Sequence, residues 1–425
     1  MSSRFVKNSG TLLSGSIIAQ GIAFAAYLLL SRLFTPEDFG LYNIFYSYIE
    51  VLIILSTCKY EMAIVKASTN DEALALTRIS LRLNVSVSAA LLVVALLLVL
   101  FHANAVPLPP ALLILIPLMV FFCGTTRVYT FVFNRYKHFR QIATSEVVTS
   151  LSGVTAKVVF GLLAATSQFL HSVGLPVGTV LGKVVGNIYY RNSASKVLPK
   201  QKPVKLGGSG LCQVLSKYRA FPLYSMPREF VSSLSANLPF MWLGVYFDEV
   251  LLGLFSLAIA FTMRPVNILA NVFEKVFYPT TNVKIGQQQP IGRNVRRFLL
   301  TLCAIVLPVL AVAFFYAEPV FTFLFGSKWT GTGYFVRCII PWITVLLLTN
   351  SLAFIPNVFT TQRGDFIFQI IQLFLRAIVL AIGIAQHNFR LAIFLFCAVS
   401  TLVQLCQLAW YLSQVKRYDR AINNK

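Results

Sequence analysis

The sequence predicts an all-α integral membrane protein of about twelve transmembrane helices arranged in two six-helix lobes. Of its 425 residues, 57% are hydrophobic and only 12% are charged. A soluble domain carries roughly 25% charged residues, so this chain could not cover a surface that faces water. Apolar runs of about 20 residues, each long enough to cross the hydrocarbon core as a helix, recur along its whole length. A short match between its two halves indicates a repeat.

Twelve apolar runs can each form a membrane span. They cover residues 11–33, 38–65, 83–102, 110–134, 143–168, 172–190, 220–247, 249–277, 297–316, 331–358, 365–386 and 389–414. A long polar stretch separates the sixth run from the seventh. The sequence therefore predicts an N-lobe at 1–190, a cytoplasmic linker at 191–219 and a C-lobe at 220–425.

The match between the halves lies at the second run of each. Phe34, Thr35, Gly40 and Leu41 align with Phe247, Asp248, Gly253 and Leu254 at one constant spacing, about half the chain. A repeat of six spans gives both halves the same topology, with an axis along the membrane normal. This is a known plan for transporters that work by alternating access.

The distribution of charge predicts the orientation. Lysine and arginine concentrate in the connections that share a side with the two chain ends, whereas the outer connections include Glu37-Asp38 and Asp248-Glu249. Because basic residues stay on the cytoplasmic side during insertion, both termini are predicted to be cytoplasmic. These loops also account for the net charge of +22, and no nucleic-acid-reading motif accompanies it.

No motif marks an enzyme or a cofactor site. The seven cysteines lie mostly inside apolar runs, and none forms a close pair with metal-ligand spacing. The sequence contains no acid–base pair, nucleophile motif or phosphate-binding loop of the Gly-Lys-Ser/Thr type. Since Thr11 already begins an apolar run without a cleavage site, no removed signal peptide is expected. We expect no catalysis, metal or cofactor.

Charged side chains inside the runs are the candidate functional residues. A cation at the centre of a membrane helix costs roughly 2.5–3.5 kcal/mol on insertion scales. The basic residues in the runs are Lys59, Arg127, Lys157, Lys183, Arg228, Arg264, Arg337 and Arg376, and the acidic ones are Glu50, Glu61, Glu146, Glu229 and Glu274. Because several of these acids sit close to the ends of their runs, the interior is expected to hold excess positive charge.

The deepest cations are predicted to line a shared cavity that binds substrate. They are Arg127, Lys157, Lys183, Arg264 and Arg376, and interhelical ion pairs are the alternative for them. A cationic cavity needs an anionic substrate, and the planar fork of arginine is suited to phosphate. Lys59 and Glu61 lie at the cytoplasmic end of their run and are expected to snorkel.

Two adjacent residues and one deep acid complete the predicted site. Arg228 and Glu229 point about 100° apart on a helix, so they do not pair with each other. One is expected to face the cavity and the other to bond a neighbouring helix. Glu50 is the best acid to pair with a deep cation or to carry a coupling proton.

Glycine and proline mark two runs. Gly174, Gly178, Gly182 and Gly186 recur at every fourth residue of the sixth run, which predicts close helix packing inside the N-lobe. Pro227 and Pro239 are expected to bend the seventh run. Such a bend accompanies either a central cavity or plain packing.

Several stretches carry a family resemblance. They are Asn8-Ser9-Gly10, residues 31–42, Phe221-Pro222-Leu223-Tyr224-Ser225, Asn237-Leu238-Pro239, Gly253-Leu254-Phe255-Ser256 and Val276-Phe277-Tyr278-Pro279. These stretches resemble polysaccharide biosynthesis flippases of the Wzx type, which translocate O-antigen or capsule repeat units and belong to the MOP (MATE-like) exporter superfamily. The resemblance in span count and length covers the whole chain.

The resemblance implies a V-shaped pair of lobes with a cationic cavity that opens alternately to each side. It implies that an undecaprenyl-diphosphate-linked oligosaccharide moves from the inner to the outer leaflet of a bacterial inner membrane. Polymerase or chain-length machinery would act afterwards, and an H⁺ gradient, a Na⁺ gradient or the membrane potential would bias the cycle. The family's binding charges vary among members, so the candidate residues above come from the spans alone.

Other functions fit parts of the pattern. A lipid II-type flippase or a MATE drug or ion antiporter would share the fold, although a cavity rich in arginine and lysine argues against cationic drugs. A membrane glycosyltransferase or polymerase would need a long outer loop with catalytic residues, and the outer connections here are short.

Overall fold

The computed structural model is helical throughout the part of the chain that it describes, which is residues 18–22, 24–101, 106–164, 167–197, 208–359 and 361–423. Eight of its helices are long and apolar enough to cross a membrane, and shorter apolar helices lie at Ile18–Leu33 and Glu249–Met263. A helix overlaps each of the twelve predicted runs. The predicted all-α membrane fold is therefore confirmed.

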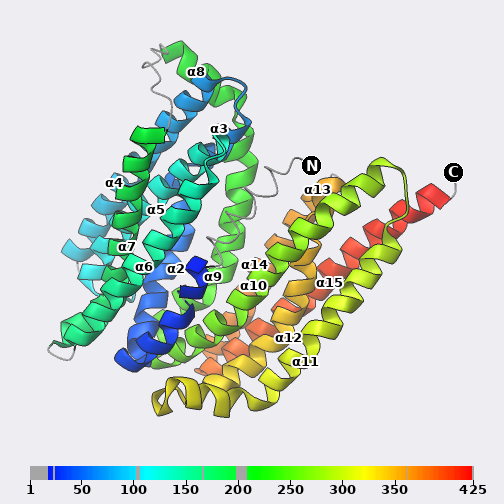
Figure 1. Cartoon of the computed structure of the whole chain (residues 1–425). Helices are drawn as coiled ribbons and strands as arrows, with labels where there is room; N and C mark the ends of the chain where they lie inside the picture. The colour runs from blue at the N-terminus through cyan, green and yellow to red at the C-terminus, as the bar shows by residue number, and fades with distance from the viewer. Residues whose placement is uncertain are drawn as a thin grey trace. The chain divides into compact units, whose positions relative to one another are not determined.

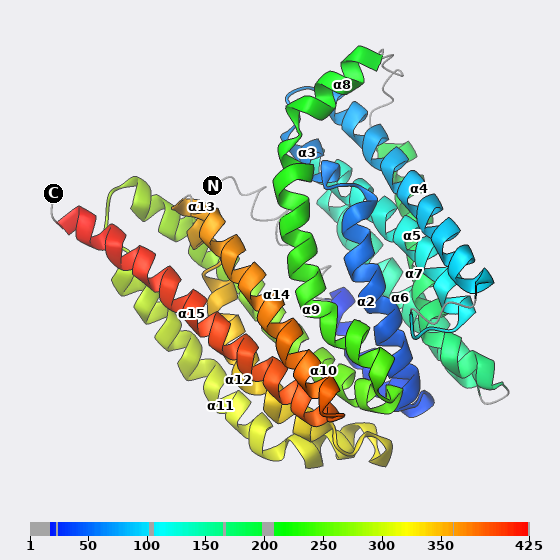
Figure 2. The same ribbon diagram turned by 180° about the vertical axis from the view of Figure 1, so that it is seen from behind.

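The chain divides into two compact units, Met1–Val245 and Tyr246–Lys425. The helices of the first unit are α2 (Pro36–Ser56), α3 (Tyr60–Lys66), α4 (Asn70–Leu100), α5 (Pro110–Arg135), α6 (Phe139–Ala164), α7 (Gln168–Val197), α8 (Gly208–Lys217), the π-helix η1 (Phe221–Ser225) and α9 (Met226–Tyr246) (Figure 1). Those of the second are α10 (Glu249–Gly286), α11 (Gly292–Phe325), the 3₁₀ helix η2 (Ser327–Trp329), α12 (Thr332–Ser351), α13 (Ile355–Val358), α14 (Gln362–Ala385) and α15 (Phe389–Asn423) (Figure 2). The seventh span, α9, thus belongs to the first unit, whereas the sequence assigns it to the C-lobe. The lobe boundaries at 190 and 220 stay a prediction.

Both halves use the same order of helix pairing. In the first, α4 packs on α5, α5 on α7, α6 on α7 and α2 on α5. In the second, α11 packs on α12, α12 on α15, α14 on α15 and α10 on α12. These helices correspond in pairs when counted along the predicted repeat, so the two halves share a packing plan as well as a short stretch of sequence.

The aligned residues of the repeat begin the aligned helices. The Thr35 hydroxyl caps α2 by accepting from the Asp38 backbone N at 3.4 Å, while the Thr35 backbone N donates to the Asp38 carboxylate at 2.8 Å. Asp248 caps α10 by accepting from the Val250 backbone N at 3.1 Å. Side-chain oxygens of this kind satisfy amide groups that the first helical turn leaves without partners. The second span of each half therefore starts at the equivalent residue.

The glycine stripe of α7 faces α6, as predicted. A Cβ built on Gly182 would lie 2.8 Å from the Gly153 Cα and 2.8 Å from the Thr149 carbonyl oxygen. One built on Gly178 would meet the Lys157 backbone N at 2.8 Å. Only helices without side chains at these positions can approach so closely. The glycine spacing in the sequence therefore marks a place where α6 and α7 pack closely in the first unit.

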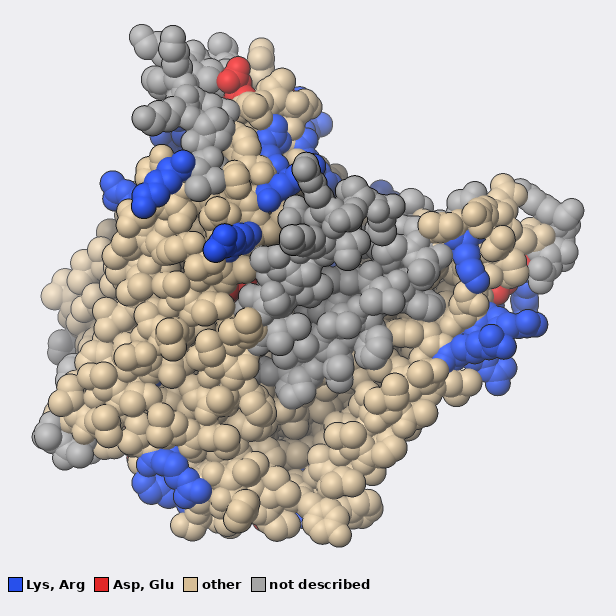
Figure 3. Space-filling model, viewed as in Figure 1, with Lys and Arg blue, Asp and Glu red and all other residues tan. Residues whose placement is uncertain are grey.

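The outer surface carries an apolar band. Val93, Val94, Leu96 and Leu97 of α4 are each about half exposed. Over the first unit, Figure 3 shows a broad region without charge between basic groups near its two ends. Surface of this kind is expected where a helix bundle faces lipid, and it supports the membrane-spanning interpretation.

A polar seam runs between α14 and α15 in the second unit. Its α14 members are Asp365, Gln369, Gln372 and Arg376, and its α15 members are Ser400, Gln404, Gln407 and Tyr411. At one end the Asp365 carboxylate accepts from Gln407 Nε2 at 2.8 Å and from the Tyr411 hydroxyl at 2.6 Å. At the other, Arg376 Nε donates to the Ser400 hydroxyl at 2.9 Å. Hydrogen bonds between membrane helices hold such pairs together.

Candidate functional site

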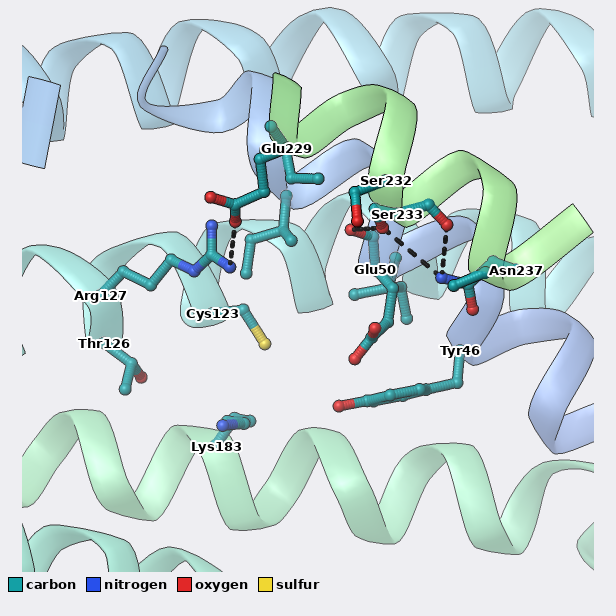
Figure 4. Close-up of a pocket in the computed structure, with 14 residues that line it drawn as sticks. Tyr46, Glu50, Cys123, Thr126, Arg127, Lys183, Glu229, Ser232, Ser233 and Asn237 are labelled. Atoms are coloured by element: carbon teal, nitrogen blue, oxygen red, sulfur yellow. Dashed lines mark hydrogen bonds and ion pairs between the residues drawn. The ribbon is translucent and has the colours of Figure 1, made fainter. Parts of the chain in front are cut away.

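A cavity of about 380 Å³ lies inside the first unit, among α2, α5, α7 and α9 (Figure 4). Its walls are Tyr46, Ile49, Glu50, Ile53 and Ile54 of α2, Cys123, Thr126 and Arg127 of α5, Lys183 of α7, and Glu229, Ser232, Ser233, Ala236 and Asn237 of α9. Four charged side chains therefore reach one space at the depth of the membrane spans.

One face of α9 forms a polar wall of the cavity. Glu229, Ser233 and Asn237 follow one another at four-residue spacing, which places them on the same side of the helix. The Ser233 hydroxyl donates to the Glu50 backbone oxygen at 3.0 Å, and Asn237 Nδ2 donates to the Ser233 backbone oxygen at 3.0 Å. The first bond joins α9 to α2, and the second lies within α9 and orients the Asn237 amide. Of the Arg228–Glu229 pair, Glu229 lines this cavity and Arg228 is not among its walls.

The charges in the cavity are of both signs. Arg127 Nη2 lies 3.3 Å from Glu229 Oε1, and Lys183 extends from α7 on the side opposite α9 (Figure 4). The Glu50 side chain is open to the cavity, with the Tyr46 hydroxyl directed toward its carboxylate (Figure 4). Arg127 therefore lines the cavity and also forms an interhelical ion pair, which was the alternative for the deep cations.

A break in the second span brings another cation to the same place. The predicted run 38–65 is interrupted between α2 and α3, where Cys58 and Lys59 take left-handed φ values of 47° and 62°. The Thr57 hydroxyl donates to Glu61 Oε2 at 2.6 Å across the break. Non-helical backbone at membrane depth is tolerated where protein surrounds it. The break turns the Lys59 side chain inward.

Lys59 does not snorkel, so that prediction is wrong. Its side chain is 5% exposed and pairs with Glu229, and its Nζ lies 3.9 Å from Glu61 Oε1. The side chain of Glu61 is fully buried. Sequence reasoning missed the break because the run is apolar on both sides of it. The available signal was Thr57 followed four residues later by Glu61, which is near the spacing of a helix-start motif.

The other predicted cations of the first unit lie outside this cavity's walls. Lys157 of α6 is half-buried, with its Nζ 5.0 Å from the centre of the Tyr42 ring. Arg228 of α9 is exposed. The structure therefore brings together Arg127 and Lys183, with Glu50 and Glu229, from the predicted set.

Two predicted cations belong to the second unit. Arg376 is 3% exposed, lies over the rings of Trp342 and Phe396 and bonds Ser400. It would reach a substrate only if the surrounding helices rearranged. Arg264 lies in α10, and its side chain is outside the described residues. The roles predicted for both stay predictions.

The fold is that of MOP superfamily transporters. The lipid II flippase MurJ in an inward closed conformation superposes with a TM-score of 0.72 at 11% identity, covering 98% of this chain and 90% of that one. An inward-facing multidrug resistance MATE family transporter gives a TM-score of 0.64 at 15% identity, with 96% of each chain covered. A MOP superfamily transporter from Pyrococcus furiosus, described as having a binding pocket of reverse polarity, gives 0.59 at 12% identity, covering 97% and 96%. This likeness defines a multi-pass membrane protein with MATE-like architecture.

Residues 29–333 match the family described as polysaccharide biosynthesis protein. The match covers more than half of the sequence, and the chain belongs to this family. A search against curated proteins gave no match. The family and fold are those that the sequence resemblance predicted.

Proposed function

We propose that the protein is a flippase that moves an undecaprenyl-diphosphate-linked oligosaccharide from the cytoplasmic to the periplasmic leaflet of a bacterial inner membrane. The family supports a polysaccharide building block as cargo. The observation that carries the proposal is the cavity of the first unit, where Arg127 and Lys183 present cations between membrane-spanning helices. An anionic head group is the cargo that such side chains recognise.

The chemistry of the cavity suits a diphosphate joined to sugar. The guanidinium of Arg127 can donate two parallel hydrogen bonds to one phosphate, and the ammonium of Lys183 can serve the other as a point charge. Ser232, Ser233 and Asn237 add hydroxyl and amide groups of the kind that bind sugar hydroxyls. At about 380 Å³, the cavity is in the range of small-ligand pockets, so it receives the head group while the prenyl chain stays in lipid.

The proposed transport also needs an energy source, an orientation in the membrane and a use for its product. Glu50 is the carboxylate that would carry a coupling proton, because its side chain is open to the cavity. Both termini would be cytoplasmic, as the loop charges predict. The product would be a repeat unit of O-antigen, capsule or a related polysaccharide, made available to a polymerase and its chain-length machinery. Lipopolysaccharide biosynthesis is one such pathway.

A second candidate is a related MOP exporter that moves a cation. The observation that favours it is the presence of two carboxylates, Glu50 and Glu229, beside the two cations in the cavity walls. Such a protein would depend on these acids rather than on Arg127 and Lys183.

The test compares alanine variants in cells that lack the native gene. Arg127→Ala and Lys183→Ala should each lower the export of surface glycan, while the lipid-linked precursor accumulates on the cytoplasmic leaflet. Loss of a charge-assisted hydrogen bond of about 1.5–3 kcal/mol corresponds to roughly a ten- to hundredfold loss of affinity. Lys217→Ala is the matched control, because Lys217 is an exposed cation on α8 outside the cavity.

Protein levels in the membrane are measured in parallel, so that a failure of insertion is not read as a failure of transport. Arg127→Lys should keep part of the activity, since it preserves charge without the fork geometry. Export at the wild-type rate in both alanine variants would contradict an anionic cargo. Loss of function in Glu50→Gln with normal export in the alanine variants would favour the second candidate.

A further inference from the structure

Glu229 spans two cations that come from different elements. Its Oε2 pairs with Lys59 Nζ in the break between α2 and α3, and its Oε1 lies 3.3 Å from Arg127 Nη2 on α5. Both oxygens of one carboxylate are therefore engaged, each by a different basic side chain. The contact also joins α9, which begins the second half of the sequence, to two elements of the first half.

The contact leaves Arg127 incompletely satisfied. Its Nη1 is buried and has no hydrogen-bond partner among the described side chains, while its Nη2 serves Glu229. A guanidinium binds an oxyanion best through two parallel hydrogen bonds, so a carboxylate held at one nitrogen is an imperfect ligand. Glu229 is 40% exposed and Arg127 is 32% exposed, whereas Lys59 is 5% exposed. The open side of the contact is thus the side that faces the cavity.

We propose that Glu229 is an internal substitute for a phosphate of the cargo. Without cargo, its carboxylate is the counterion that Lys59 and Arg127 share, because a buried cation without a counterion is strongly unfavourable. An incoming phosphate takes the place of Glu229 on Arg127, since two anions cannot share that position without repulsion. This inference rests on the proposed function, which supplies an anionic cargo.

Replacement of Glu229 by phosphate on Arg127 would loosen the attachment of α9 to its neighbours. Glu229 is part of α9, and its partners are part of the break after α2 and of α5. When phosphate takes Arg127, α9 loses its ionic contact to α5, and the hydrogen bond from Ser233 to the Glu50 backbone oxygen of α2 remains. A ligand shifts a conformational equilibrium only by binding its states unequally. Phosphate binds more tightly to the arrangement in which Glu229 has left Arg127, and it shifts the population toward that arrangement.

The test measures the binding of inorganic pyrophosphate to the full-length protein in nanodiscs by calorimetry. Glu229→Gln keeps the size of the side chain and removes the competing charge. The variant should bind pyrophosphate about twofold to fivefold more tightly than wild type, which is the upper part of the range for a partly exposed ion pair. Glu72→Gln is the matched control, because Glu72 forms a comparable ion pair with Lys217 at 2.6 Å outside the cavity. Its affinity for pyrophosphate should equal that of wild type.

Arg127→Ala tests whether pyrophosphate binds at Arg127 at all, whereas Glu229→Gln tests whether Glu229 competes with it. If Arg127→Ala abolishes pyrophosphate binding but Glu229→Gln binds no more tightly than wild type, then Glu229 only supports the fold and the inference is overturned. If neither wild type nor Glu229→Gln binds pyrophosphate, the anionic site itself fails. Undecaprenyl diphosphate in the bilayer should displace bound pyrophosphate, and indifference to the lipid would assign the site to a soluble anion and contradict the proposed cargo.

A second variant covers the case in which Glu229→Gln lowers stability. Lys59 keeps Glu61 at 3.9 Å in that variant, so folding is expected. Lys59→Gln combined with Glu229→Gln removes the buried cation together with its partner and still leaves Arg127 without a competitor. This double variant should also bind pyrophosphate more tightly than the Lys59→Gln single variant, and equal affinity would overturn the inference.

Discussion

The close contact of α6 and α7 allows a pair of matched substitutions with opposite expected outcomes. Gly182 and Gly153 face each other across this contact, and each can be changed to alanine. A Cβ on Gly182 meets backbone atoms at 2.8 Å, whereas one on Gly153 meets the Gly178 carbonyl oxygen at 3.5 Å and the Gly182 Cα at 3.6 Å. The same added methyl group therefore clashes on one helix and fits on the other.

The sizes of the two effects follow from these distances. Gly182→Ala forces the backbones apart by several tenths of an ångström, and overpacking of this kind costs typically 1–3 kcal/mol. Alanine recovers up to about 1 kcal/mol of helix propensity at either site. With that recovery subtracted, we expect a net loss of up to about 2 kcal/mol for Gly182→Ala. For Gly153→Ala we expect no loss, or a gain of up to about 1 kcal/mol.

Thermal and denaturant unfolding of the two variants in the same detergent measures this difference directly. Gly182→Ala should unfold first and Gly153→Ala no earlier than wild type. Equal stability of the two variants, or greater damage from Gly153→Ala, would refute the packing that the structure gives for this helix pair.

Two further predictions concern the seam and the topology. Asp365→Ala leaves the donors of Gln407 and Tyr411 without their acceptor and should lower the free energy of unfolding by about 2–3 kcal/mol, whereas Tyr411→Phe should cost about 1 kcal/mol. Equal losses in unfolding experiments would contradict the central place of the carboxylate. In a background without native cysteines, Asp248→Cys should react with a membrane-impermeant thiol reagent from outside and Lys217→Cys should not. The reverse labelling pattern would overturn the predicted orientation.

The sequence was a good guide to the helices and a poor guide to their charged contacts. Apolar length predicted the spans in the described part of the chain, and the repeat aligned Thr35 with Asp248, which cap α2 and α10. The break before Lys59 escaped prediction because hydropathy does not record backbone direction. The pair of Arg127 with Glu229 joins residues that lie 102 positions apart, and only the tertiary structure brings them together. The position of a charged residue within an apolar run identifies it as a candidate, but its partners depend on the tertiary structure.

The polar seam of α14 and α15 has a consequence for how the second unit can move. Its two ends carry unlike chemistry, a carboxylate that accepts from Gln407 and Tyr411 and a guanidinium that donates to Ser400. Asp365 and Arg376 are separated by eleven residues, or about 16 Å along the helix axis. Sliding one helix past the other by a single turn would break the bonds at both ends together. We therefore expect the two helices to move together when the second unit changes conformation, with the change concentrated in the connections on either side of the pair.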